Sequence, residues 1–159
     1  MKTYITILGR SDWAVINTYY AVLKHKKFFP DYIYVITEDI YEPELEKVIA
    51  GLNILSDAFD FHPEINSKIM KEANFAESGI QINNLIKKLK KDSPEIAIDI
   101  TSGRKALVAA TLLPLYKNHV DYLFYLAIKT TKEVNKPYEM IPMQIQNLRD
   151  FVHEGESIK

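Results

Sequence analysis

Two short polar segments carry the residue types that hold phosphates and other anions in proteins. Segment 101–105 (TSGRK) lies between the apolar run Ile96–Ile98 and the apolar stretch 106–113, and segment 9–12 (GRSD) follows the apolar run Tyr4–Leu8. A helix that begins directly after such a turn directs open amide groups and the positive end of its dipole at the turn. Arg104 and Lys105 add two cations. The pattern predicts an anion site at the end of a strand.

A plainer interpretation explains the same residues without a ligand. Thr101 or Ser102 caps the following helix, Gly103 supplies an unusual backbone angle, and the two cations are solvated. Ser11 or Asp12 caps a helix after the first strand in the same way. The two interpretations differ in whether the two turns meet at one place.

The elements that must position these turns follow from the apolar pattern. Buried strands are predicted at Tyr4–Leu8, Tyr32–Ile36, Ile96–Ile98 and Tyr122–Ile128, with a weaker strand at Asp57–Phe61. Helical spacing predicts helices over residues 11–24, 43–54, 64–91 and 106–113, the third interrupted near Gly79. The late segments are predicted as an edge strand over Glu139–Gln144 and a short helix over Asn147–Val152.

Strands separated by helical stretches of ten or more residues indicate βαβ units and a mainly parallel sheet. The fold class is therefore Rossmann-like α/β in one domain, residues 1–159. Parallel strands present their carboxyl ends at one edge, so one crevice is expected to collect the side chains of both turns: Arg10, Ser11, Thr101, Arg104 and Lys105. Neither G-x-G-x-x-G nor G-x-x-x-x-G-K-[ST] occurs, which argues against a conventional dinucleotide or NTP enzyme.

Composition restricts the partners. The chain has 20 basic and 21 acidic residues, so a diffuse positive surface for duplex nucleic acid is not expected. The basic cluster at 87–91 is interpreted as the solvated end of an amphipathic helix. There is no cysteine, no apolar run of membrane-spanning length, and no histidine pattern with metal-ligand spacing. We expect a soluble cytoplasmic protein that uses no metal and no cofactor.

The segment 99–105 (DITSGRK) resembles the D-x-T-G-G-x-K signature of CARF domains, the sensors of cyclic oligoadenylate in type III CRISPR defence. The segments LGRSDWAVINTYYAVL, PDYIYVITE, VDYLFYL and MIP fall in similar places, so the resemblance covers nearly the whole chain. Asp99, Thr101, Gly103 and Lys105 match the signature, whereas Ser102 stands where the family often has glycine.

The resemblance implies a homodimer whose two crevices face each other across a two-fold axis and bind one ring, most often cyclic tetra-adenylate. An isologous dimer presents each donor twice and suits a symmetric ring. The helix over 106–113 is apolar on nearly every face, which fits burial against a partner or burial wholly within the monomer. We expect the ligand-binding residues to be Gly9, Arg10, Asp12, Trp13, Thr37, Asp99, Thr101, Ser102 and Gly103.

Two functions of different classes remain open. A stand-alone domain of this family resembles the metal-independent ring nucleases, in which a ribose 2′-OH attacks the neighbouring phosphorus and leaves a 2′,3′-cyclic phosphate. Lys105 and Arg104 are then the candidates for charge stabilisation and Ser11 for orienting the phosphate, with Lys129 and Lys132 as alternatives. The second function is a binding module that senses the ring for an effector.

Two further assignments concern single residues. Trp13 and Tyr19 either stack on adenine or belong to the core. Asp99 is expected to fix the turn as a hydrogen-bond acceptor rather than to act as a general base, because burying a carboxylate without partners is costly.

Overall fold

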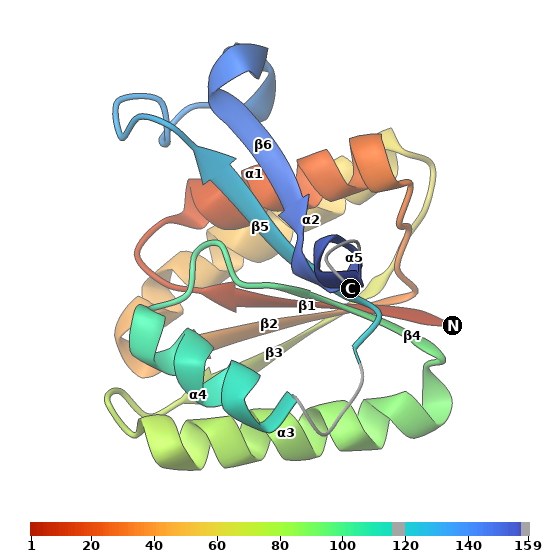
Figure 1. Cartoon of the computed structure of the whole chain (residues 1–159), viewed down its shortest axis with the longest axis vertical. Helices are drawn as coiled ribbons and strands as arrows, with labels where there is room; N and C mark the ends of the chain where they lie inside the picture. The colour runs from red at the N-terminus through yellow and green to blue at the C-terminus, as the bar shows by residue number, and fades with distance from the viewer. Residues whose placement is uncertain (116–119, 157–159) are drawn as a thin grey trace.

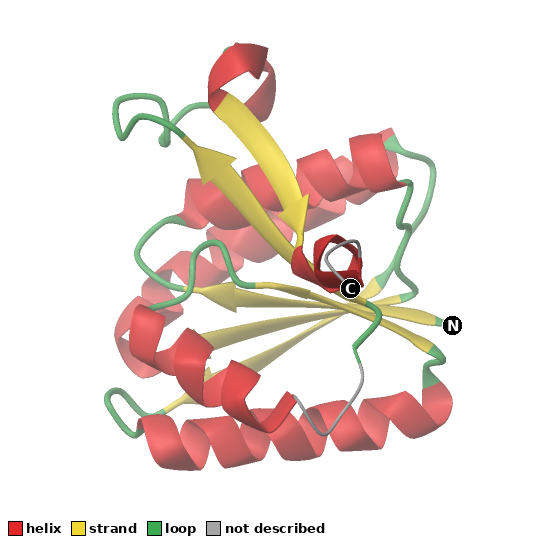
Figure 2. Ribbon diagram, in the orientation of Figure 1, coloured by secondary structure: helices red, strands yellow, loops and turns green. Residues whose placement is uncertain are grey.

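A six-stranded sheet divides the molecule into two helical layers (Figures 1 and 2). The computed structural model describes residues 1–115 and 120–156. The strands are β1 (Lys2–Leu8), β2 (Tyr32–Glu38), β3 (Glu64–Met70), β4 (Glu95–Asp99), β5 (Tyr122–Ile128) and β6 (Gln146–Asp150). The helices are α1 (Asp12–Ala21), α2 (Leu45–Ala58), α3 (Phe75–Asp92), α4 (Lys105–Leu115) and α5 (Phe151–Glu156).

The strand order β3-β2-β1-β4-β5-β6 confirms the Rossmann-like class. All neighbouring pairs are parallel except β5 and β6, which are antiparallel. Helices α1 and α2 lie on one face of the sheet, and α3 and α4 lie on the other (Figure 1). The chain therefore leaves the adjacent strands β1 and β4 toward opposite faces, which makes their carboxyl ends the topological switch point.

A hydrophobic core lies on each face of the sheet, and alternating residues of β1 contribute to the two cores. Tyr4 and Leu8 pack with residues of α1 and α2, while Ile5 and Ile7 pack with residues of α3 and α4. All four side chains are at most 1% exposed. A strand buried on both faces reads as a continuous apolar run, which is why the sequence locates β1, β2 and β4 correctly. The apolar run of β5 is also located correctly, although this strand is only partly buried.

The third strand was predicted in the wrong place. Residues 57–61 end α2 and form the turn after it, whereas β3 is Glu64–Met70, within the stretch predicted as helix. The spacing of Ile65 and Ile69 is four residues, which fits the helical repeat and also two strand repeats. As an edge strand, β3 has a mixed polar pattern that does not separate the two.

Other boundaries also differ from the sequence-based expectation. Pro43 lies in a 3-10 turn before α2, and α2 continues to Ala58 rather than ending near residue 54. Gly79 does not interrupt α3; a Cβ there would lie 2.6 Å from the carbonyl oxygen of Ala110, so glycine permits the close crossing of α3 and α4. The stretch predicted as an edge strand, 139–144, lies instead in two 3-10 turns, Tyr138–Met140 and Met143–Ile145, and the edge strand is β6, where a helix was predicted.

No helix within the described residues is long and apolar enough to cross a membrane. The basic residues at the end of α3 are largely exposed, and the Lys90 ammonium contacts the Asp121 carboxylate at 2.7 Å. This arrangement agrees with the interpretation of that cluster as a solvated helix end.

Candidate functional site at the switch point

A hollow of about 440 Å³ lies where the turns after β1 and β4 meet, and it is lined by Arg10, Ser102, Gly103, Arg104, Lys105 and Ala106. The two polar segments found in the sequence thus converge, as predicted, and Arg10, Arg104 and Lys105 line the hollow. Ser11 and Thr101 were expected in the same crevice but are not among its lining residues. Lys105 is the first residue of α4, so the amino-terminal end of that helix borders the hollow. An anion here faces side-chain cations and the positive end of a helix dipole together.

Ser102 fastens the two turns to each other. The Gly9 N–H donates to the Ser102 hydroxyl oxygen at 3.0 Å, and this hydroxyl donates to the Ser11 carbonyl oxygen at 2.7 Å. The backbones approach so closely that a Cβ on Gly9 would lie 2.1 Å from the Ser102 carbonyl oxygen. The serine that departs from the CARF signature therefore holds the hollow together.

Gly103 is required for space rather than for an unusual backbone angle. Among the described glycines none has a positive φ. A Cβ on Gly103 would lie 2.7 Å from a methyl of Val108 and 2.9 Å from a methyl of Ile7. The expectation about its backbone angle is wrong, because close packing of the turn against β1 and α4 explains the glycine instead.

Asp99 and Thr101 fix the turn from beneath. Asp99 is fully buried; one carboxylate oxygen accepts the Thr6 hydroxyl at 2.8 Å, and the other accepts the Thr101 N–H at 2.9 Å. The Thr101 hydroxyl accepts the Leu126 N–H at 3.0 Å, which joins the turn to β5. Asp99 is not among the residues that line the hollow, and these hydrogen bonds agree with the expected role of a structural acceptor.

The pKa of Asp99 leads to a prediction about stability. Burial raises this pKa from 3.8 to about 6, while hydrogen bonds from Thr101 and Thr6 favour the charged form and limit the rise. A raised carboxyl pKa means that the native state binds more protons than the unfolded state between these values. Stability contributed by the protonated form is thus complete below pH 3.8 and is lost as the pH rises through about 6.

Asp99→Asn should remove this pH dependence. Chemical denaturation at a series of pH values should show the wild-type free energy of unfolding falling by roughly 2 kcal/mol relative to the variant between pH 4 and pH 7. Titrations common to both proteins cancel in the difference. Parallel stability curves would show that the Asp99 pKa is not raised.

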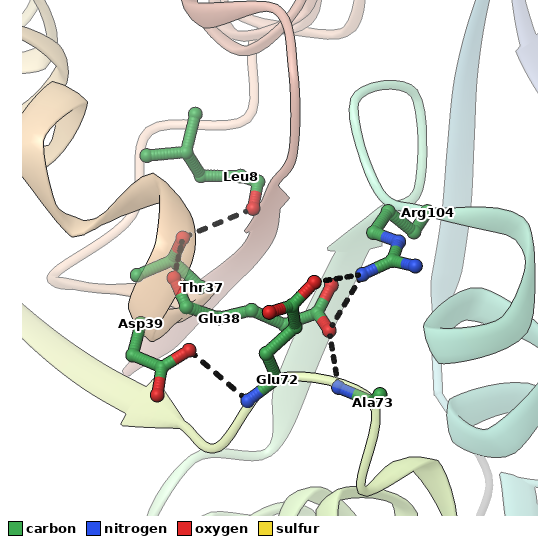
Figure 3. A network of polar contacts seen from close by, with 7 residues as sticks. All are labelled: Leu8, Thr37, Glu38, Asp39, Glu72, Ala73 and Arg104. Atoms are coloured by element: carbon green, nitrogen blue, oxygen red, sulfur yellow. Dashed lines mark hydrogen bonds and ion pairs between the residues drawn. The ribbon is translucent and has the colours of Figure 1, made fainter.

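Arg104 is ion-paired, not simply solvated as the plainer interpretation had it (Figure 3). Its Nη1 lies 3.2 Å from Oε1 of Glu38 and 3.5 Å from Oε1 of Glu72. The guanidinium also lies over the Phe75 ring, at 5.4 Å from its centroid. The acids at the ends of β2 and β3 thus offset much of the Arg104 charge.

The carboxylate of Glu38 is the functional-site feature that the sequence reasoning missed. Glu38 is 2% exposed, and its Oε1 also accepts the Ala73 N–H at 3.2 Å. The sequence feature that could have identified Glu38 is its position directly after Thr37, at the carboxyl end of a buried parallel strand. Removing Arg104 would leave this carboxylate buried without a countercharge, so Arg104→Ala should destabilise the fold as well as the site.

Arg10 and Lys105 are the exposed cations of the hollow. Neither forms an ion pair with another described residue. In residues 1–115 and 120–156, no three His, Asp or Glu side chains gather so that they could hold a metal ion. The chemistry available in the hollow is therefore electrostatic binding and positioning of an anion by cations, amides and hydroxyls.

The remaining predicted site residues lie beside or away from the hollow. The Ser11 hydroxyl caps α1 by accepting the Ala14 N–H at 3.1 Å, and its own proton is donated to no acceptor in the part of the chain that the structure describes. The Thr37 hydroxyl is buried and donates to the Leu8 carbonyl oxygen at 3.1 Å, which ties β2 to β1. Lys129 and Lys132 do not line the hollow.

The first turn of α1 is directed toward α2. Asp12 forms an ion pair with Lys47, whose ammonium lies 6.0 Å from the centroid of the Trp13 ring. Trp13 lines a second, apolar pocket of about 210 Å³, bounded by α1, α2 and residues 137–139. Tyr19 is fully buried and shares a hydrogen bond with Ser56, so it belongs to the core and is not available for stacking.

Comparisons with known proteins identify the fold. No family model and no curated protein matches this chain in sequence. The structure matches protein VC1899 from Vibrio cholerae, with a TM-score of 0.61 and 11% identity over 78% of this chain and 30% of that one. It also matches Can2 from Sulfobacillus thermosulfidooxidans in complex with cyclic tetra-adenylate, with a TM-score of 0.54 and 17% identity over 79% of this chain and 32% of that one.

A third match is Csm6 from Enterococcus italicus bound to cyclic hexa-2′-fluoro-hexa-dAMP, with a TM-score of 0.64 and 14% identity over 99% of this chain. Can2 and Csm6 are CARF-domain proteins of type III CRISPR systems. The chain spans 44% of that Csm6 and about a third of the other two proteins. At these identities the likeness establishes a shared fold.

Proposed function

We propose that this chain, whose fold is that of the CARF domains, binds a cyclic oligoadenylate in the hollow between the ends of β1 and β4. The observation that carries the proposal is that two exposed cations, Arg10 and Lys105, line the hollow beside the amino-terminal end of α4 at the switch point. The folds of Can2 and Csm6 support it, because both were solved with cyclic adenylate ligands. Cyclic tetra-adenylate is the ligand we expect to bind most tightly.

We propose further that the ligand-binding form is a homodimer. One hollow can contact only part of a ring, whereas two hollows related by a two-fold axis offer Arg10 and Lys105 to opposite phosphates. Helix α4 carries an exposed apolar stripe of Ala106, Ala109 and Leu113, and the Leu113 side chain is 80% exposed in the single chain. Pairing of this stripe with its own copy would remove it from water and place the hollows side by side.

Leu113→Asp should therefore convert the dimer to a monomer, because a carboxylate would be buried at the apolar stripe. Light scattering at micromolar concentration should give twice the chain mass for the wild type and the chain mass for the variant. Ile54→Asp is the matched control, since Ile54 is 67% exposed on α2, at the opposite face of the sheet. A wild-type monomer, with and without ligand, would contradict the dimer.

The proposed reaction is metal-independent opening of the ring. A ribose 2′ oxygen attacks the adjacent phosphorus, and the bond from phosphorus to the 5′ oxygen breaks. The 2′ hydroxyl loses one proton and the departing 5′ oxygen gains one. The product is linear, with a 2′,3′-cyclic phosphate at one end and a 5′-OH at the other. Lys105 would stabilise the phosphoryl oxygens in the transition state, and the free proton of Ser11 would orient the phosphate.

A specific observation favours the second candidate function, a sensor that binds the ring without cleaving it. No carboxylate or imidazole is among the residues that line the hollow, so no general base is in place in the described single chain. Catalysis would then depend on alignment and charge stabilisation alone, which predicts a slow enzyme. Ring binding without turnover is the sensor outcome.

Incubation with labelled cyclic tetra- and hexa-adenylate in EDTA, followed by chromatography, separates the two functions. The ring-nuclease function predicts products with a 2′,3′-cyclic phosphate that form equally fast with and without EDTA. Tight binding with recovery of the intact ring after hours would support the sensor. Absence of binding to either ring would contradict both.

A further inference from the structure

Arg104 has two edges with different surroundings. Its Nη1 contacts both Glu38 and Glu72, whereas Nε and Nη2 donate to no acceptor among the described residues. Figure 3 shows these two nitrogens directed away from the carboxylates. The edge formed by Nε and Nη2 carries two parallel N–H donors, which is the geometry that binds a phosphate in bidentate fashion.

Of the two acids, only Glu38 is held rigidly. It is 2% exposed, accepts the Ala73 N–H, and follows Thr37, whose hydroxyl bonds β2 to the last residue of β1. The Glu72 side chain is 49% exposed, lies in the loop after β3, and contacts Nη1 at the longer distance of 3.5 Å. Phe75 supports the guanidinium from one face. Glu38 is therefore the contact able to define the orientation of the guanidinium.

We propose that Glu38 is a positioning residue that holds Arg104 by Nη1, so that the Nε–Nη2 edge faces a phosphate of the ring. This inference rests on the proposed function and assigns the residue that prepares its anion site. An unrestrained arginine loses considerable rotamer freedom when it binds a ligand, and a guanidinium fixed beforehand has already lost it. Glu38 thus favours binding even though its charge has the same sign as the phosphate.

Glu38→Gln and Glu72→Gln form a matched pair that separates positioning from net charge. Both substitutions remove one negative charge beside the same guanidinium nitrogen, and both keep the size of the side chain. A pure charge effect would tighten the binding of cyclic tetra-adenylate in both variants by similar factors. Loss of positioning would weaken binding in Glu38→Gln alone.

The expected result in titration calorimetry is about a tenfold weaker affinity for Glu38→Gln, the loss of roughly one charge-assisted hydrogen bond, and a much smaller change for Glu72→Gln. In an Arg104→Lys background, Glu38→Gln should cost little further affinity, because the guanidinium that Glu38 positions is absent. Equal affinities in the two single variants, or a similar loss from Glu38→Gln in both backgrounds, would overturn the proposal.

A ligand-free readout keeps this proposal distinct from the proposed function. The ¹⁵N relaxation of the Arg104 Nε–H group, assigned by its loss in Arg104→Lys, should indicate an ordered side chain in the wild type and in Glu72→Gln but a mobile one in Glu38→Gln. Equal mobility in all three proteins would refute positioning. If Arg104 is ordered but the protein does not bind the ring, Glu38 still positions Arg104. The proposed function, and the part of this inference that concerns the phosphate, would then be contradicted.

Discussion

Lys105→Ala should lower the rate of ring opening by ~100-fold or more, the loss typical when one preorganised donor to a developing negative charge is removed. Lys105 begins α4, lines the hollow and forms no ion pair with another described residue, so its charge is available to the phosphoryl oxygens. Single-turnover rates measured with saturating protein separate this effect from weaker binding. The fold should persist, because the side chain is exposed.

Lys129→Ala is the matched control for that experiment. Lys129 follows β5 at the same edge of the sheet but does not line the hollow, so its removal should leave the rate within about twofold of the wild type. Ser11→Ala should slow the reaction less than Lys105→Ala does, because a neutral donor stabilises the phosphate less than a cation. A rate lost in Lys129→Ala and retained in Lys105→Ala would move the catalytic cation to the loop after β5.

Gly9→Ala should have the largest structural effect on the site. The added Cβ would lie 2.1 Å from the carbonyl oxygen of Ser102 and 3.4 Å from the backbone nitrogen of Arg104. Backbone atoms cannot move aside as a flexible side chain would. The two turns must separate, which breaks the paired hydrogen bonds of Ser102. We expect a loss of roughly 1–3 kcal/mol in the free energy of unfolding and a loss of ring binding of at least tenfold.

Gly155→Ala is the control for the same chemical change, because a Cβ on Gly155 meets no atom within 4 Å. Thermal unfolding and ring binding of this variant should match the wild type. If Gly9→Ala binds the ring as tightly as Gly155→Ala does, the two turns need not be fastened together for binding.

Among the strands that the sequence predicts correctly, β1, β2 and β4 are buried on both sides and read as continuous apolar runs because helices cover both faces of the sheet there. β5 is also an apolar run, although it is only partly buried and its Tyr125 is 38% exposed. The edge strands β3 and β6 have polar, mixed patterns, and their pairing with a neighbour decides their structure. The pattern of apolar residues along the chain does not indicate which strands pair, which is why both segments were predicted as helix.

The candidate site could likewise be predicted only in part from the sequence. Topology alone brings segments 9–12 and 101–105 together, so the convergence of Arg10, Arg104 and Lys105 could be predicted. The Ser102 bridge and the Glu38–Arg104 pair depend on side-chain contacts between residues 66 or more positions apart. Nothing in the local sequence indicates which acid reaches which cation, so the pairing of Arg104 with Glu38 and Glu72 could not be predicted.

Titration calorimetry of cyclic tetra-adenylate into the wild-type chain and Lys105→Ala tests the central claim most directly. Binding in the hollow predicts one ring for every two chains, with an affinity that falls by at least tenfold in Lys105→Ala while thermal unfolding of the ligand-free protein stays unchanged. No heat of binding in the wild type, or equal affinity in both proteins, would contradict a cyclic oligoadenylate site at the junction of β1 and β4.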